Sequence, residues 1–160
     1  CGFFNHREKE CVCAQGQVKK YLSRISGPLL DRIDLHVEVT PVSSDQLMEN
    51  HRSQEGSSEI RQRVHDARNR QETRFWDSPL IHFNAQIPSG QVRDICRISE
   101  AGQTLLKNAM TKLQLSARAY DRILKVSRTI ADLDNSEEIA LEHLAEAIHF
   151  RSLDREGWTG

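Results

Sequence analysis

The sequence predicts a mainly α-helical protein in which a C-terminal bundle of helices follows a smaller part with one β-strand. Apolar residues recur at intervals of three and four through most of residues 58–160, the spacing of one helix face. Over residues 33–39 apolar and polar residues instead alternate, as in a half-buried strand. A stretch rich in Ser, Gln, Asn and Glu separates these parts. We therefore divide the chain into residues 1–42, a linker at 43–57 and a helical domain at 58–160.

The first part is predicted to contain two short helices before the strand. Val18 and the apolar residues spaced after it predict a helix at residues 17–24. Pro28 suits the first turn of a second helix, because its missing N–H would have no partner there in any case. A strand at residues 33–39 cannot be stable alone, so we interpret this part as the edge of a larger sheet.

The second part is predicted to consist of helices separated by short loops. Ser116 is suited to cap the helix with the most regular apolar pattern. The apolar face of the first helix is predicted to consist of Ile60, Val64, Ala67 and Gln71. The predicted helices cover residues 58–75, 90–98, 99–113, 117–132 and 141–151.

Length and composition limit the classes of protein to consider. A chain of 160 residues is long enough for one domain, or for a small domain and part of another. Its net charge of −1 provides no general attraction to nucleic acids or membranes, so any such contact needs a local patch. The sequence has no apolar run long enough to span a bilayer and no secretory signal, which predicts a cytoplasmic protein. The opening Cys1-Gly2-Phe3-Phe4 is interpreted as an internal segment of a longer chain.

Three of the four cysteines are close together in the sequence. Cys1, Cys11 and Cys13 are candidate zinc ligands, because thiolates bind zinc in tetrahedral sets of four. His6 or a residue upstream of Cys1 would be the fourth ligand. Free, reduced thiols are the alternative interpretation. The isolated Cys96 is predicted to be a small buried residue without a chemical role.

Four stretches carry a family resemblance: Cys1-Gly2, Cys11-Val12-Cys13, Leu29-Leu30-Asp31-Arg32 within residues 21–37, and Leu115-Ser116-Ala117-Arg118 within residues 115–126. Together they closely resemble the ComM (YifB) family of bacterial, magnesium-chelatase-like AAA+ ATPases. The resemblance implies that residues 1–42 are the C-terminal edge of an α/β AAA+ core and that residues 58–160 are its helical lid. It also implies ATP and Mg²⁺ as cofactors of a longer protein, which forms a ring, expected to be a hexamer. This ring would act on DNA as a branch-migration helicase in natural transformation.

The same resemblance implies roles for individual residues. Arg32 matches the arginine finger, which reaches the γ-phosphate bound by a neighbouring subunit, and Arg118 matches the second sensor of the lid. The alternatives are a surface Arg32 paired with Asp31 or Asp34, and a solvated Arg118. Arg24 is either a further trans-acting arginine or a charge favoured at a helix end.

The resemblance also extends to the cysteines. Family members carry a Cys-Pro-Cys-Gly run, in which Cys1 would be the second cysteine. Cys1, Cys11 and Cys13 would then be three of the four thiolates of a zinc site.

A helix rich in arginine is a candidate contact for DNA. Arg63, Arg70 and Arg74 lie near one face of the helix at residues 58–75 and could follow a phosphate backbone. Acidic residues interleave with them, so a solvated helix with ion pairs is the alternative.

Two further functions remain open from the sequence. One is a zinc-stapled helical interaction module with no role in ATP hydrolysis, and the other is the motor subunit of a metal chelatase. Residues 1–160 contain no phosphate-binding loop, so the chain alone is predicted not to hydrolyse ATP.

Overall fold

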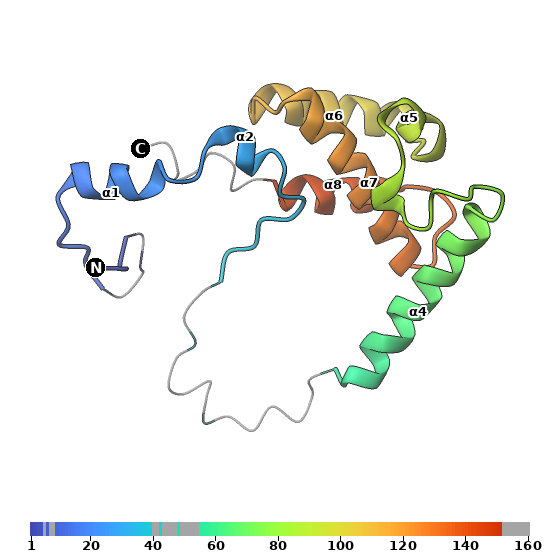
Figure 1. Ribbon diagram of the computed structural model, residues 1–160, viewed down its shortest axis with the longest axis horizontal. Coiled ribbons are helices and arrows are strands. Elements are labelled where there is room, and N and C mark those ends of the chain that lie inside the picture. Colours follow the sequence, from blue (N-terminus) through green and yellow to red (C-terminus); the bar gives the residue numbers. More distant parts are fainter. Residues whose placement is uncertain (5, 7–8, 40–41, 43–47, 49–54, 152–160) are drawn as a thin grey trace.

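The computed structural model describes residues 1–4, 6, 9–39, 42, 48 and 55–151, and the described part is mainly helical (Figure 1). The predicted linker at residues 43–57 and the last residues of the predicted helical domain lie largely outside the described residues. No helix in the described part is long and apolar enough to cross a membrane. The prediction of a mainly helical chain with a C-terminal bundle is confirmed, whereas the domain boundaries stay a prediction.

The N-terminal part contains two short helices, α1 (Gln15–Leu22) and α2 (Gly27–Leu30). Pro28 lies in the first turn of α2, as its fixed φ and missing N–H predict. Asp31 follows as the C-cap residue, and its N–H bonds the carbonyl of Gly27 at 2.9 Å. The sequence therefore places a tight helical turn directly before Arg32.

The strand predicted at residues 33–39 is wrong, because this segment has no regular secondary structure and pairs with no strand among the described residues. Ile33, Leu35, Val37 and Val39 are exposed rather than buried on one face. A strand needs a neighbouring strand to satisfy its N–H and C=O groups, and the described residues contain none.

The bundle is built around α7, which contacts α4, α5, α8 and the turn η1. Figure 1 shows α4 reaching away from the other helices at its N-terminal end. The elements of the bundle are α4 (Ser57–Arg74), the 3₁₀ turns η1 (Asn84–Gln86) and η2 (Ser89–Gln91), α5 (Val92–Ile95), α6 (Glu100–Lys112), α7 (Ala117–Leu133) and α8 (Leu141–His149). The helix predicted at residues 90–98 is shorter than expected, because the chain leaves helical geometry at Cys96 and pairs Ile98 with Ile139 in a parallel bridge.

Serine caps begin the two longest helices after α4. The hydroxyl of Ser116 accepts a hydrogen bond from the N–H of Ala119 at 3.3 Å, which confirms it as the N-cap of α7. Ser99 does the same for α6 through the N–H of Gly102 at 3.2 Å. Both caps satisfy a backbone donor that the first helical turn leaves without a partner.

The apolar face predicted for α4 is only half buried. Ala67 and Gln71 are buried, but Ile60 and Val64 are 44% and 45% exposed. The reason is that only the C-terminal half of α4 packs on the bundle, where its side chains meet the end of α7. The prediction for Ile60 and Val64 is therefore wrong.

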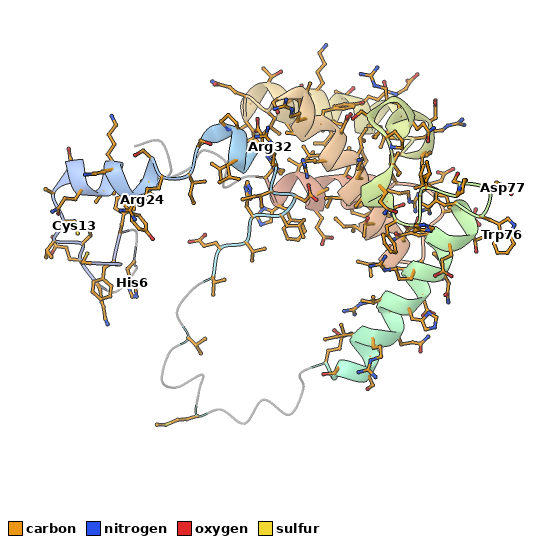
Figure 2. All side chains as sticks on the ribbon, in the orientation of Figure 1. His6, Cys13, Arg24, Arg32, Trp76 and Asp77 are labelled. Carbon is orange, nitrogen blue, oxygen red and sulfur yellow. The ribbon has the colours of Figure 1, made fainter. Side chains whose placement is uncertain are left out.

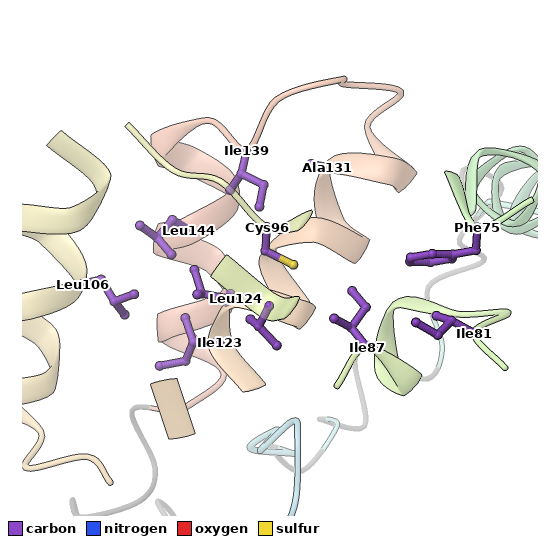
Figure 3. Close-up of a cluster of buried hydrophobic side chains, with 12 residues drawn as sticks. Phe75, Ile81, Ile87, Cys96, Leu106, Ile123, Leu124, Ala131, Ile139 and Leu144 are labelled. Atoms are coloured by element: carbon purple, nitrogen blue, oxygen red, sulfur yellow. The ribbon is translucent and has the colours of Figure 1, made fainter. Parts of the chain in front are cut away.

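The core gathers buried apolar side chains from α5, α6, α7 and α8 and from the segments between the helices (Figure 3). Cys96 lies inside this cluster and is 1% exposed, which confirms it as a small buried residue. Burial raises the pKa of the Cys96 thiol to about 11. Its thiol therefore stays protonated near neutral pH and is a weak nucleophile.

Candidate functional site

Arg32 lies on the surface directly after α2 (Figure 2). Its Nη1 donates a hydrogen bond to the carbonyl oxygen of Pro28 at 2.8 Å, within its own turn. It makes no ion pair with the other residues that the structure describes. Arg32 therefore does not pair with Asp31 or Asp34, which was the alternative. These carboxylates instead lie against Arg151 and Arg122. A guanidinium has five N–H donors, and the described residues take one of those of Arg32, so the others are open to a ligand.

Arg151, at the end of the bundle, holds the chain on both sides of Arg32. Its side chain is buried, and its Nη1 donates to the carbonyl oxygen of Ile33. Its Nη2 is 3.5 Å from the carbonyl oxygen of Leu30 and 3.8 Å from the carboxylate of Asp31. One buried guanidinium thus contacts the residues before and after Arg32 while Arg32 itself points out.

A second set of contacts ties the same segment to the bundle. The carboxylate of Asp34 pairs with the guanidinium of Arg122 on α7. Two residues later, the N–H of His36 donates to the carbonyl oxygen of Phe150 at 2.9 Å. Residues 30–36, which we call the finger segment, are therefore fastened to both α7 and the end of α8.

Sequence reasoning missed Arg151, Arg122 and the finger segment's contact with the bundle. The hydrogen-bond partners of Arg151 are backbone carbonyls more than 100 residues earlier in the chain. Every residue has a backbone carbonyl, so the residue types give no sign of this contact. Arg122 was visible as a charged residue on α7, but nothing in its neighbourhood points to Asp34. Only the folded chain brings these groups together.

Arg118 is the second residue of α7 and is exposed. It has no hydrogen bond or ion pair with the described part of the chain. It lies one turn before Arg122, so residues four apart on α7 carry a free cation and a cation paired with the finger segment. The unpaired N–H groups of the first turn add partial positive charge beside Arg118. An anion is the ligand that this arrangement favours.

Arg24 lies apart from these groups. It follows the end of α1, and Figure 2 shows it apart from Arg32. Its guanidinium is 6.0 Å from the centre of the Tyr21 ring, a cation–π contact on the protein surface. The structure does not bring Arg24 together with Arg32 within one chain.

The three N-terminal cysteines come together as the sequence predicted. The sulfur atoms of Cys1, Cys11 and Cys13 all lie within 4.8 Å of one another, and those of Cys1 and Cys11 are 3.5 Å apart. Sulfur atoms bound to one zinc ion are separated by about 3.8 Å, given Zn–S bonds of about 2.3 Å. The cluster therefore fits three corners of a zinc tetrahedron.

His6 is outside this cluster. Its ring packs edge-on against Phe3, with the ring centres 5.6 Å apart, and it is not among the residues grouped around the thiols.

The arginines predicted to contact DNA have partners within the protein. Arg63 forms an exposed two-pronged ion pair with Glu55, at 2.6 and 2.9 Å. The guanidinium of Arg70 donates to the side chain and carbonyl oxygen of Asn135. DNA contact by Arg63 and Arg70 would compete with these bonds, and it stays a prediction.

Arg74 has a structural partner that the sequence did not reveal. Its two terminal nitrogens lie 2.8 and 2.5 Å from the carboxylate oxygens of Asp132, which is fully buried at the end of α7. Arg128 approaches the same carboxylate at 3.2 Å. Burial lowers the pKa of Arg128, and Asp132 opposes that effect. DNA contact by Arg74 would have to break this network.

A separate groove of about 730 Å³ lies between α5, α6 and α7. Leu106, Met110 and Leu124 contribute apolar surface, and its three cations are Arg93, Arg97 and Lys107. The guanidinium of Arg93 lies 5.5 Å from the centre of the Tyr120 ring. Among the residues that the structure describes, no carboxylate lines the groove, so its charge favours an anionic ligand. Sequence analysis did not single out these residues.

Comparison with known protein families identifies the class of protein to which this helical chain belongs. The family model described as magnesium chelatase, subunit ChlI C-terminal, matches residues 54–151, and the model described as magnesium chelatase, subunit ChlI, matches residues 1–47. The first match covers more than half of the chain, so the chain belongs to the magnesium-chelatase family. The two matches meet within the predicted linker.

Individual relatives agree with this assignment. Competence protein ComM of Haemophilus influenzae is 40% identical over 139 residues, which cover 87% of this chain and 26% of the relative. The uncharacterised protein YifB of Escherichia coli is 38% identical over 143 residues, covering 89% and 27%. YifB of Salmonella typhimurium is 35% identical over 144 residues, covering 89% and 27%. The chain thus spans about a quarter of the length of these curated relatives.

Proposed function

We propose that this chain is the C-terminal part of a longer magnesium-chelatase-like ATPase, to which it contributes Arg32 as an arginine finger and Arg118 as a second sensor. The observation that carries the proposal is the contrast around Arg32. The residues on both sides of it are fastened to the bundle, whereas its own guanidinium is exposed and has no ion-pair partner in the described part of the chain. An exposed guanidinium that folding leaves without an ion-pair partner at an anchored position is suited to a ligand from outside the chain.

Phosphoryl transfer is the chemistry that such a group serves. Negative charge on the γ-phosphoryl oxygens must be stabilised while the bond to the leaving oxygen breaks, and an arginine finger contributes about 10³ to 10⁵ in rate. ATP and Mg²⁺ would be held by the phosphate-binding core of the longer protein. Arg32 would approach the γ-phosphate bound by a neighbouring subunit, which requires a ring or another assembly of copies.

Arg118 would contact the nucleotide from the lid. Its support is its place in the first turn of α7, where the helix N-terminus and an unpaired guanidinium both favour an anion. The finger segment contacts the same helix one turn later through Arg122. Both proposed nucleotide-contacting arginines are therefore anchored to α7, one on it and one beside it.

For the longer protein we propose a hexameric ring that acts on DNA as a branch-migration helicase. The family and the name of one relative, a competence protein, support a role in natural transformation. Arg63 and Arg70 remain the candidate DNA contacts on α4. A second basic surface, the groove of the bundle, provides a comparison for these DNA contacts. Its cations are Arg93, Arg97 and Lys107.

Replacing Arg32 tests the finger. In the longer protein, Arg32→Ala should lower kcat for ATP by about 10³-fold or more, because the charge that develops on the γ-phosphoryl group loses its partner. The Kd for ATP should change little, since the finger belongs to the neighbouring subunit's site. Steady-state phosphate release and binding of a fluorescent ATP analogue measure the two quantities.

The matched control for Arg32 is Arg97→Ala, which also removes an exposed arginine but lies in the groove of the bundle. It should leave kcat close to the unmodified value. An unchanged kcat in Arg32→Ala would refute the finger.

The second candidate function is a zinc-stapled interaction module, which the cluster of three thiols favours. A segment extended upstream of Cys1 should bind about one zinc ion per chain, and Cys11→Ser with Cys13→Ser should abolish this. Elemental analysis of the purified protein measures the ratio. A ratio near zero would remove the zinc site and this function with it.

A further inference from the structure

We propose that Arg151 is the positioning residue for Arg32, and that together with the Asp34–Arg122 pair it clamps the finger segment to the lid. This rests on the proposed role of Arg32 in ATP hydrolysis. The clamp would make the finger of one nucleotide site and the sensor helix of the next site parts of a single body.

The burial of Arg151 carries the first step. Lysine and arginine side chains are almost never fully buried unless their charge is compensated, because desolvation of a charged group costs several kcal/mol. The side chain of Arg151 is 1% exposed, and the partners it finds are the carbonyl oxygens of Ile33 and Leu30 and the carboxylate of Asp31. The buried charge of Arg151 is therefore compensated by three residues next to Arg32 in the chain.

The geometry of the guanidinium carries the second step. Its planar fork has donors in fixed directions, so two nitrogens that bond different carbonyls set the orientation of the backbone between them. That backbone is the peptide of Asp31 and Arg32. The Cα of Arg32 is therefore fixed from both sides, and only its outward side chain is left to move.

The third step is the link to α7. Asp34, two residues after Arg32, pairs with Arg122, and Arg122 lies one helical turn after Arg118. The N–H of His36 adds a backbone bond to Phe150 at 2.9 Å. A movement of the lid on binding of nucleotide at Arg118 would therefore carry Arg32 with it toward or away from the neighbouring subunit.

Arg151→Lys in the longer protein is the principal test. Lysine keeps the charge but loses the fork, so Arg32 loses its orientation while the finger itself is intact. Because a misplacement of about 1 Å can cost about 10²-fold in rate, kcat should fall by roughly that factor at an unchanged KM for ATP. A kcat equal to that of the unmodified protein would overturn the proposal.

Arg128→Lys is the matched control, since Arg128 is also a buried arginine that donates to two backbone carbonyls, those of Glu137 and Ser136, at 2.7 and 2.6 Å. Its carbonyls lie at the other end of α7, so the variant should lose stability yet keep kcat. Equal losses of kcat in the two variants would reduce Arg151 to a structural residue and overturn the proposal.

Mixed assemblies separate positioning from folding. Arg151→Gln subunits keep their own phosphate-binding loop, and subunits with the loop lysine replaced keep their finger. Mixing two such inactive proteins should restore ATP hydrolysis at interfaces that combine the intact halves, as it should for Arg32→Ala. No recovery for Arg151→Gln, where Arg32→Ala recovers, would indicate a misfolded subunit and overturn the proposal.

The charge pair is tested by exchange of its partners. Asp34→Arg and Arg122→Asp should each lower kcat, and the double variant should regain part of the loss. Equal kcat in all three variants and the unmodified protein would remove the pair from the clamp. An active Arg32→Ala protein would refute the finger itself, whereas an inactive Arg32→Ala beside a fully active Arg151→Lys would refute only the clamp.

Discussion

At the scale of single residues, burial separates four arginines of this chain into two groups. Arg32 and Arg118 are exposed and make no ion pair within the described part of the chain, so they are available to a ligand. Arg151 and Arg128 are buried, and terminal nitrogens of both donate to backbone carbonyls. Residue type alone does not separate these two groups, because all four are the same side chain on or beside a helix.

The buried thiol of Cys96 should make the stability of the fold depend on pH. The unfolded thiol has a pKa near 9.0 and burial raises the folded value to about 11, so the folded state holds the proton more tightly. This contribution to stability is fully present below pH 9 and is lost as the pH rises through about 11. Two units of pKa correspond to roughly 2 to 3 kcal/mol of unfolding free energy.

Urea denaturation of residues 1–160 between pH 8 and pH 11 measures this effect. Other groups also titrate in this range, so the change in unfolding free energy is compared with that of Cys96→Ala. This variant keeps the other titrating groups but has no thiol at position 96. The unmodified chain should lose roughly 2 kcal/mol more than the variant over this range. Parallel curves for the two proteins would show that the Cys96 thiol does not titrate as proposed.

At the scale of elements, the helices were predictable and their packing was not. The regular apolar spacing and the cap at Ser116 predicted α7 to within a residue, because both signals are local. The same spacing predicted a buried Ile60 and Val64 on α4, which are exposed because α4 packs through its C-terminal half only. Helix formation depends on residues that are close in sequence, whereas the face that becomes buried depends on which other helices pack against it.

The network at Asp132 fastens α4 to α7 and should dominate their association. Asp132→Ala leaves Arg74 and Arg128 without their shared carboxylate in a buried site, which costs about 3 to 5 kcal/mol of unfolding free energy. The control is Glu55→Ala, which breaks the exposed pair with Arg63 and should cost about 0 to 1 kcal/mol. Urea denaturation at neutral pH measures both variants, and similar losses would contradict the network's role.

At the scale of the whole molecule, the described part of the chain consists of a helical bundle and an N-terminal part that meets it through the finger segment. The contacts run from residues 30–36 to α7 and to the end of α8. The chain spans about a quarter of its curated relatives, and its alternating segment at 33–39 has no strand to pair with among the described residues. Both facts are consistent with a site whose remaining half is contributed by other residues.

The isolated chain should therefore not hydrolyse ATP. Residues 1–160 lack the phosphate-binding loop whose N–H groups and lysine hold the β- and γ-phosphates. Phosphate release from the purified chain with ATP and Mg²⁺ should equal that of a buffer blank, and Arg32→Ala should change nothing. Release above the blank that disappears in Arg32→Ala would contradict this prediction.

The sequence by itself determined most of the helices, the cap at Ser116, the cluster of thiols and the family, because each depends on local spacing or on long matching motifs. Only the tertiary structure decided that the segment at 33–39 is not a strand, that Arg74 is bound to Asp132, and that Arg151 holds the chain around Arg32. Those contacts join groups far apart in the chain, and several involve backbone carbonyls. No pattern of residue types encodes a carbonyl's partner, so only the folded chain reveals it.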